Sequence, residues 1–290
     1  MISRQDKGKI LVLGGSSRIG SLMRESWKLK STKDVIWHYR NKSAHKRDIF
    51  LKNEIYFDLD NYSSAVVNEL GNIDTVLCLA GISSGTQSEL HLNTELAEAG
   101  LKLSEDLNAK RFYYASSIAV YGYGEKLTEL DSPKPVSEYG QSKLDAEIFL
   151  RQSESQVSVI SLRMANALFA DSITRQLVLP SQDNLINLDF FPNGKTLCRS
   201  YIDSNSLCNI LDLLSKVDFP SFSVLNIASI EAMYADHLLK KLKVPWLKNY
   251  RSNWEGQKIT LSTELLQEVV KGSSFRDLWS ESISSWVGAK

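Results

Sequence analysis

The first half of the chain alternates short apolar runs with stretches of helical periodicity, and this alternation constrains the fold more than any other feature. Short runs rich in Val, Ile, Leu and aromatic residues are typical of buried strands, whereas the intervening stretches are long enough for helices. The predicted strands are Lys9–Leu13, Val35–Tyr39, Ile55–Phe57, Thr75–Ala80, Phe112–Ala115 and Val157–Leu162. The predicted helices are Ile19–Lys30, Ser63–Leu70, Glu89–Leu107 and Tyr139–Ser153. Such alternation predicts an α/β fold built on a doubly wound parallel sheet with helices on both faces.

The pattern loosens beyond Leu162. Residues 164–198 hold several loop signals, among them Pro180, Pro192 and Asn193-Gly194. A predicted helix, Ser204–Lys216, and a predicted strand, Ser223–Ala228, then return to the sheet. We therefore expect one domain over residues 1–163, with 204–228 returning to it. A smaller, interleaved C-terminal region is expected over 164–203 and 229–290.

Composition excludes several classes of protein. The chain is 43% hydrophobic and 23% charged, as in ordinary globular proteins, and Lys+Arg and Asp+Glu number 34 each. This balance predicts no nucleic-acid partner and no membrane surface. The three cysteines and four histidines show neither disulfide nor metal-ligand spacing, and no apolar run has the length of a membrane span. We expect a cytoplasmic protein without a metal site, with a homodimer left open.

A glycine-rich segment, Gly14-Gly15-Ser16-Ser17-Arg18-Ile19-Gly20, follows the first predicted strand and opens the first helix. Glycines there permit a tight turn and let backbone amides approach a pyrophosphate, which the positive end of the helix attracts. Many strand–helix turns contain two glycines, but at the first strand of an alternating chain we favour a dinucleotide site. The predicted contacts are Gly14, Ser16, Ser17, Arg18, Ile19 and Gly20.

The second predicted strand ends in Trp37-His38-Tyr39-Arg40, without an acidic residue. An Asp or Glu at such a place binds the ribose 2′-hydroxyl of NAD, whereas an Arg accommodates the 2′-phosphate of NADP. Arg40 and Arg18 together are predicted to bind that phosphate, although each alone is equally well explained as a surface arginine. The expected cofactor is NADP, with NAD as the alternative.

A serine pair and a Tyr-x-x-x-Lys motif form the predicted catalytic centre. Ser117 ends the strand that begins at Phe112, and Tyr139 and Lys143 follow at i and i+4 on a predicted helix, so both project from one face. A free tyrosine titrates near pH ~10, and an ammonium one turn away brings its pKa toward neutrality. Ser117 would hydrogen-bond the substrate oxygen. Taken alone, the Tyr-x-x-x-Lys motif favours a structural role for Tyr139 and Lys143. Together with Ser117 and the glycine loop, it favours a catalytic role.

Six segments in chain order resemble the extended short-chain dehydrogenase/reductases, the NAD(P)-dependent epimerase/dehydratase family that modifies mostly nucleotide sugars. They are the glycine loop, Phe57-Asp58-Leu59, Leu79-Ala80-Gly81, Ser116-Ser117-Ile118-Ala119-Val120-Tyr121-Gly122, Tyr139–Lys143 with Glu147, and Arg199-Ser200-Tyr201-Ile202-Asp203. The resemblance implies a Rossmann-type fold, in which the first domain binds the dinucleotide and the C-terminal region binds substrate.

The resemblance also assigns roles to individual residues. It implies that Asp58 and Leu59 contact adenine, that Leu79, Ala80 and Gly81 line the cofactor, and that Lys143 also holds the nicotinamide ribose. In the substrate region, Arg163 and Asn166 match an Arg-x-x-Asn motif whose asparagine touches the substrate. Arg199 matches an arginine that commonly binds the nucleotide diphosphate.

Three departures narrow the choice within the family. Ser17 stands where the usual glycine loop has its middle glycine. Ile118 and Ala119 stand where 4,6-dehydratases carry the Asp-Glu pair that eliminates water, and no cysteine is present there as in the epimerase-reductases of fucose synthesis. The reactions that remain are oxidation and reduction at one carbon, as catalysed by a nucleotide-sugar 4-ketoreductase or 4-epimerase. Of these two, an NADP site favours the reductase.

Two other functions stay open. One is an NADP-dependent reductase of a small non-nucleotide ketone or aldehyde. The other is a binding protein that senses NADP without chemistry, although such proteins typically lack the Tyr/Lys pair that this chain retains.

Overall fold

A computed structural model of the chain describes residues 8–30, 34–42, 53–177, 185–228, 232–254 and 256–270. The loop signal expected at Pro180 lies outside these residues.

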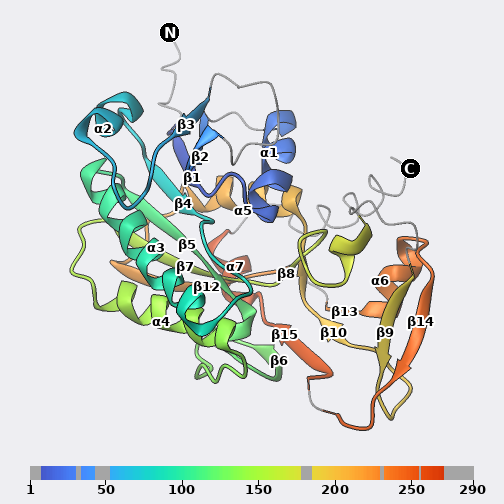
Figure 1. The fold of residues 1–290 in the computed structure, drawn as a ribbon. Coiled ribbons are helices and arrows are strands. Elements are labelled where there is room, and N and C mark those ends of the chain that lie inside the picture. Colours follow the sequence, from blue (N-terminus) through green and yellow to red (C-terminus); the bar gives the residue numbers. More distant parts are fainter. Residues whose placement is uncertain are drawn as a thin grey trace. The chain divides into compact units, whose positions relative to one another are not determined.

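A seven-stranded sheet forms the centre of the fold. Its strands are β1 (Ile10–Leu13), β2 (Val35–Tyr39), β3 (Glu54–Tyr56), β4 (Thr75–Cys78), β5 (Arg111–Ser117), β7 (Ser158–Met164) and β12 (Phe222–Ile227). They lie in the order β12-β7-β5-β4-β1-β2-β3 (Figure 1), and the four pairs from β5 to β3 are parallel. The predicted strands are thus confirmed.

Helices cover both faces of this sheet. They are α1 (Arg18–Lys30), α2 (Ser64–Leu70), α3 (Gln87–Asp106) and α4 (Glu138–Gln152). Ala97 of α3 and Leu150 of α4 share a core with Ile36 of β2. The next residue of β2, Trp37, points to the opposite face, where its ring lies 6.0 Å from that of Trp27 in α1. The doubly wound α/β fold expected from the alternation is therefore confirmed.

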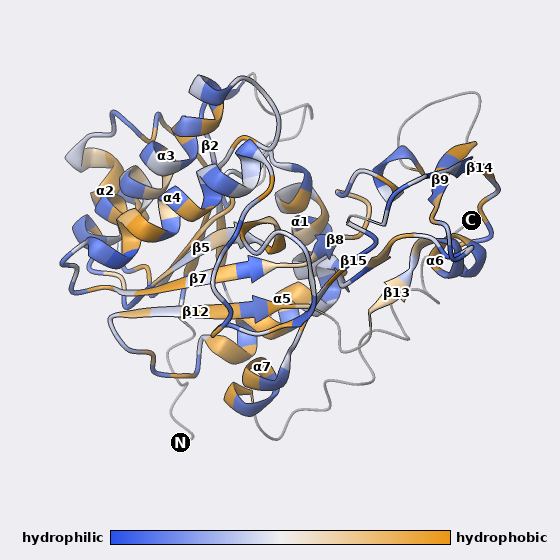
Figure 2. Ribbon diagram, turned by 90° about the horizontal axis from the view of Figure 1, so that it is seen from below, coloured by the Kyte–Doolittle hydropathy of each residue, from blue (hydrophilic) through white to orange (hydrophobic). Residues whose placement is uncertain are grey.

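Hydrophobic burial explains why these segments form the sheet. β1 and β4 are buried along their whole length, as strands covered on both faces must be. Figure 2 shows mostly hydrophobic strands, whereas the helices carry hydrophilic and hydrophobic stretches side by side. Each large side chain that is fully buried, such as Phe112 or Leu103, contributes about 1.5–3 kcal/mol relative to an exposed one.

The later part of the chain forms smaller sheets. Four strands, β6 (Gly124–Leu127), β10 (Cys198–Arg199), β13 (Met233–Tyr234) and β15 (Lys258–Leu261), lie in the order β13-β10-β15-β6. Two further pairs are β8 (Asn166–Ala167) with β11 (Tyr201–Ile202), and β9 (Ile186–Phe190) with β14 (Trp246–Tyr250). The remaining helices are α5 (Ser204–Leu214), α6 (Ala235–Lys241) and α7 (Glu264–Val269), with short 3-10 turns at Ile118–Val120 and Thr174–Leu177.

The chain divides into two compact units that interleave along the sequence. The first unit is formed by residues 1–116, 137–162 and 218–224, and the second by 117–136, 163–217 and 225–290. Most of the range predicted for dinucleotide binding lies in the first unit, whereas 117–136, 163, 204–217 and 225–228 group with the second. None of the helices in the described ranges is both long and apolar enough to cross a bilayer.

Candidate active site

The glycine loop packs its backbone against the end of β4. Gly14 has φ +82°, and a Cβ atom there would lie 2.6 Å from the amide nitrogen of Ala80. A Cβ atom on Gly20 would lie 2.8 Å from the carbonyl oxygen of Gly14. Both positions therefore require glycine, the first for its backbone conformation and both for close approach. The loop and Ala80, predicted to line one cofactor, do lie side by side.

Ser17, which stands where the usual glycine loop has its middle glycine, caps α1. Its Oγ accepts a hydrogen bond of 3.0 Å from the Gly20 amide, and its own amide donates to the Gly14 carbonyl oxygen at 2.9 Å. The first turn of a helix leaves several amides without intrahelical acceptors, and Ser17 satisfies one of them. The Ser17 side chain thus connects the glycine loop to the first turn of α1, and the positive end of the helix dipole lies next to the loop.

Lys143 reaches from α4 to the same region. Its side chain is buried, and Nζ donates to the Ala115 carbonyl oxygen at 2.9 Å and to the Tyr114 hydroxyl at 3.2 Å. A Cβ atom at Gly81 would lie 3.2 Å from Nζ, so the ammonium lies directly beside that backbone. The residues present fit a nicotinamide dinucleotide: the glycine loop, the backbone after β4 and Lys143 all meet within the first unit.

Burial sets the electrostatics of this lysine. Desolvation lowers the pKa of Lys143 to about 8, against the opposing effects of Cys78 and Glu147, which favour the charged form. The Cys78 thiol is fully buried at the end of β4, and burial raises its pKa to about 11. Cys78 is therefore a neutral thiol at physiological pH.

Tyr139 lies in the first turn of α4, one turn before Lys143. Ser137 caps this helix, because its Oγ accepts a hydrogen bond of 3.1 Å from the Gly140 amide. Tyr139 is half-buried, whereas Lys143 is 5% exposed. The i,i+4 arrangement expected from the sequence is present in the described helix.

The two serines at the end of β5 face in opposite directions. Ser116 is buried and its Oγ donates to Glu147 Oε1 at 2.5 Å. Ser117 is half-buried, and its Oγ accepts a hydrogen bond of 3.2 Å from the Ala119 amide. Ser117 groups with the second unit, whereas Tyr139 groups with the first. Ser117 lies two positions after Ala115, whose carbonyl oxygen accepts the hydrogen bond from Lys143.

Asn93 of α3 is a residue of this site that the sequence analysis missed. It is fully buried, accepts a hydrogen bond from the Ile82 amide at 2.8 Å, and donates to the Ile82 carbonyl at 2.9 Å and to Ser142 Oγ at 3.0 Å. Ser142 in turn donates to the Tyr139 carbonyl oxygen. Asn93 thus ties the segment after β4 to the first turn of α4. The available signal was an amide on the apolar face of the helix, three residues after Leu90.

The end of β2 carries a buried polar network in place of an acidic ribose ligand. Arg24 of α1 donates to the Tyr39 hydroxyl and pairs with Glu54 Oε1 at 2.5 Å, while Tyr56 donates to Glu54 Oε2 at 2.8 Å. The Tyr39 ring is buried, and a Cβ atom at Gly15 would lie 3.1 Å from it. The carboxylate of Glu54 is therefore paired with the guanidinium of Arg24.

The two arginines predicted to bind a 2′-phosphate are both exposed in the first unit. Arg18 donates to Ser83 Oγ at 2.7 Å, and Arg40 directly follows β2. Arg40 lies close enough to His38 to help lower the pKa of that imidazole, for which burial is the main cause. The clamp of Arg18 and Arg40 stays a prediction.

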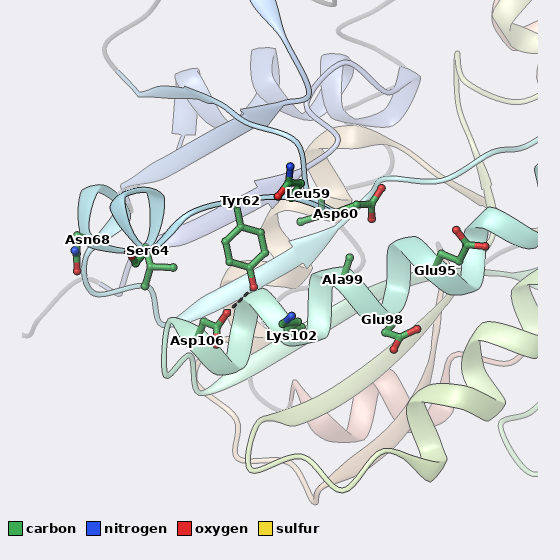
Figure 3. Close-up of a pocket in the computed structure, with 12 residues that line it drawn as sticks. Leu59, Asp60, Tyr62, Ser64, Asn68, Glu95, Glu98, Ala99, Lys102 and Asp106 are labelled. Carbon is green, nitrogen blue, oxygen red and sulfur yellow. Dashed lines mark hydrogen bonds between the residues drawn. The ribbon is translucent and has the colours of Figure 1, made fainter.

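A pocket of about 760 Å³ lies in the first unit beside α3 (Figure 3). Its lining residues are Leu59, Asp60, Asn61, Tyr62, Ser64, Val67, Asn68, Glu95, Glu98, Ala99, Lys102 and Asp106. Tyr62 donates a hydrogen bond of 2.6 Å to Asp106, marked by the dashed line. Only Leu59 among these residues was predicted to contact the cofactor, and its neighbour Asp58 is exposed outside the lining. Because carboxylates outnumber the single lysine, the pocket is unsuited to phosphate groups.

The predicted substrate residues lie in the second unit. Asn166 is half-buried at the start of β8, and its backbone amide donates to the Ser200 carbonyl oxygen at 3.2 Å. Arg163 is buried, with its guanidinium 4.6 Å from the centre of the Tyr121 ring. Within the described ranges, no cluster of three or more His, Cys, Asp or Glu side chains is placed to hold a metal ion.

Arg199 is engaged with the protein backbone. Its guanidinium donates to the carbonyl oxygens of Cys198, Gln257 and Gly256 at 2.8, 2.9 and 2.7 Å. These bonds connect β10 to the segment before β15. The diphosphate contact implied for Arg199 stays a prediction, and the bonds to described residues use three of the five N–H groups of the guanidinium.

Comparison with solved structures extends over nearly the whole chain. ADP-L-glycero-D-manno-heptose-6-epimerase from Helicobacter pylori is 18% identical with a TM-score of 0.75, covering 99% of each chain. UDP-N-acetylglucosamine 4-epimerase from Methanobrevibacter ruminantium M1 is 18% identical with a TM-score of 0.73, covering 98% of this chain and 97% of that one. MoeE5, solved with UDP-glucuronic acid and NAD, is 22% identical with a TM-score of 0.71, covering 97% and 99%. At these identities the likeness establishes the fold.

Sequence comparison identifies the family. No curated protein sequence matches the chain. The family model described as the NAD dependent epimerase/dehydratase family matches residues 10–171, which include the glycine loop and the Tyr139–Lys143 motif. This chain belongs to the NAD dependent epimerase/dehydratase family.

Proposed function

We propose that the protein is a nucleotide-sugar oxidoreductase that interconverts a hydroxyl and a ketone at one ring carbon, as a 4-ketoreductase or a 4-epimerase. The observation that carries this proposal is the placement of the Lys143 ammonium, buried beside Gly81 and one helical turn after the half-buried Tyr139. The names of the three similar structures reported above each include a nucleotide-linked sugar, which supports nucleotide sugars as the substrate class.

The chain's own residues would divide the work as follows. Tyr139 holds or releases the proton of the substrate oxygen, and the positive charge of Lys143 one turn away favours its phenolate. Ser117 donates a hydrogen bond to the same oxygen. The nicotinamide, when bound, accepts or supplies the hydride. Ile118 and Ala119 carry no acid or base after the serine, so no residue there supports elimination of water.

We further propose NADP as the preferred cofactor, at a site formed by Arg18 and Arg40. The end of β2, Trp37-His38-Tyr39-Arg40, contains no acidic residue to bind a ribose hydroxyl, and Glu54 on the neighbouring strand β3 is paired with Arg24. Both arginines are exposed, so their guanidinium groups are accessible to a phosphate. NADH binding as tight as that of NADPH would contradict this assignment.

One observation favours the second candidate, an NADP-dependent reductase of a small ketone or aldehyde. Arg199, the residue implied to bind a diphosphate, donates instead to three backbone carbonyls. A substrate without phosphates would not need it. The three cysteines, Cys78, Cys198 and Cys208, are all buried and form no disulfide bond with a described residue, which supports a reducing, cytoplasmic location for either activity.

The test is a conversion assay with UDP-, GDP-, dTDP- and CDP-sugars in the presence of NADPH or NADP, followed by mass spectrometry and sugar analysis. We expect wild-type protein to convert at least one of them, and Tyr139→Phe to lose more than nine-tenths of the rate while still binding NADPH. If wild type converts none of the four classes but reduces small ketones, the second candidate is the better description. A Tyr139→Phe variant at wild-type rate would remove Tyr139 as the acid.

A further inference from the structure

Two adjacent tyrosines of β5 differ in what their hydroxyl groups do. Tyr113 and Tyr114 are both fully buried, but they point to opposite faces of the sheet. The Tyr114 hydroxyl accepts a hydrogen bond of 3.2 Å from Lys143 Nζ, and the same nitrogen lies 4.7 Å from the centre of its ring. The Tyr113 hydroxyl has no hydrogen-bond partner among the described residues.

We propose that Tyr114 is a positioning residue that holds the Lys143 ammonium in its charged form and aims it at Gly81 and the first turn of α4. This inference rests on the proposed function, in which Lys143 assists Tyr139. Nothing in the catalytic motif itself includes Tyr114, since it lies three residues before the predicted catalytic Ser117.

The geometry limits where the ammonium can point. An ammonium has three N–H groups, and Nζ donates one to Tyr114 and one to the Ala115 carbonyl oxygen at 2.9 Å. The two acceptors belong to consecutive residues of one strand, so they fix the nitrogen against the end of β5. One N–H group is left for a ligand or for Tyr139. Gly81 provides the space, because a Cβ atom there would lie 3.2 Å from Nζ.

Few other groups support the charge of Lys143. Glu147 on the same helix and Cys78 on β4 both favour the ammonium, but Cys78 is a neutral thiol and Glu147 accepts the hydrogen bond of Ser116. From α3 the facing polar residue is the neutral Asn93. Burial acts against all of them and lowers the pKa of Lys143 to about 8. An additional acceptor therefore matters for the charge state near neutral pH.

Tyr114 suits this role because it stays neutral. Burial raises its pKa well above the ordinary value, and the carboxylate of Glu147 acts in the same direction. Its oxygen therefore remains a hydroxyl acceptor across the working pH range, while the ring adds a cation–π contact. A carboxylate in the same place would also keep Lys143 protonated, but it would offset the positive charge that the proposed mechanism uses.

The test compares Tyr114→Phe with Tyr113→Phe. Both variants remove one buried hydroxyl from β5 and keep the ring, but only the first removes an acceptor from Lys143. The Lys143 side chain is followed by NMR in protein labelled with ¹³C-lysine, with its resonance assigned through Lys143→Arg. We expect a titration midpoint of about 8 in wild type, unchanged in Tyr113→Phe and lowered by about one pH unit in Tyr114→Phe.

Enzyme kinetics give a second readout. The alkaline limb of the pH profile of kcat/KM should move to lower pH in Tyr114→Phe by about the same amount, and stay in place in Tyr113→Phe. An unchanged Lys143 midpoint in Tyr114→Phe, or an equal change in both variants, would overturn the proposal. The NMR titration needs no substrate, so a failure of the nucleotide-sugar assignment would leave its result interpretable.

Discussion

Lys143 is a cation held in the folded protein against the effect of its own burial. It is 5% exposed, and burial lowers its pKa to about 8. In the unfolded chain a lysine titrates near ~10.4 and so binds its proton more tightly than the folded protein does. The resulting destabilisation is present in full below pH 8 and disappears as the pH rises toward the unfolded value.

Replacing this lysine should therefore stabilise the protein while abolishing its chemistry. We expect Lys143→Met to raise the free energy of unfolding at pH 7 by on the order of 1–3 kcal/mol, since the bonds to Tyr114 and Ala115 offset part of the gain. The difference from wild type should shrink between pH 8 and 10. Denaturant unfolding at several pH values measures both effects. A variant that is less stable than wild type at pH 7 would show that the ammonium is a net structural contributor.

At the same scale, two residues show what the sequence could and could not predict. Tyr139 and Lys143 were found because their spacing alone places them on one helical face. The direction of Arg199 depends on carbonyl oxygens of Gly256 and Gln257, which lie more than fifty residues further along the chain. No local pattern reports such a contact, so the motif resemblance identified the residue without its bonding partners.

At the scale of elements, the N-terminal cap of α4 deserves a test because this helix carries Tyr139 and Lys143. Ser137 accepts a hydrogen bond of 3.1 Å from the Gly140 amide, whereas Ser63, at the N-cap of α2, makes no side-chain cap bond. We expect Ser137→Ala to cost about 1 kcal/mol of stability and Ser63→Ala almost nothing. Thermal unfolding of the two variants makes the comparison.

The same cap should matter for turnover. Tyr139 lies in the first turn, so loss of the Ser137 bond should loosen the residue that we propose as the acid, and kcat should fall severalfold. Affinity for NADPH should change little, because Lys143 lies one turn further into the helix. Equal stability of Ser137→Ala and Ser63→Ala, or a kcat unaffected by the first, would argue that packing alone holds this turn.

The strands of the central sheet could be predicted because they are apolar runs, such as the fully buried β1 and β4, and the helices between them because most are long enough to show their period. The predicted start of α3, Glu89, is two residues later than the observed start, Gln87. The helix begins earlier because Thr86 and Glu89 form a capping box, which the prediction did not use. In the second unit, strands such as β8 and β10 have two residues each, too few for alternation to be recognised. The exposed β14 pairs with β9 more than fifty residues earlier. Such strands are defined by tertiary pairing, which the sequence pattern does not report.

At the scale of the whole molecule, the two units share their strands. The boundaries between residues 116 and 117, 162 and 163, and 224 and 225 fall inside β5, β7 and β12. Unfolding one unit would therefore interrupt three strands that continue into the other. Neither unit is a contiguous stretch of chain, so we expect the protein to lose its structure in one cooperative transition.

Ligand binding to the first unit should consequently stabilise the entire chain. At a concentration one hundred times its dissociation constant, a ligand adds about 2.7 kcal/mol, which corresponds to a rise in Tm of about 5 °C. If Arg18 and Arg40 bind a 2′-phosphate, the same concentration of NADP should raise Tm by several degrees more than NAD does. Calorimetry with each dinucleotide measures this, and Arg40→Ala should remove the difference while leaving the smaller effect of NAD intact. Two separate unfolding transitions, with the dinucleotide raising the midpoint temperature of only one, would show that the units unfold independently despite their shared strands. A larger shift with NAD would assign the end of β2, with Tyr39 at its tip, to a ribose without phosphate.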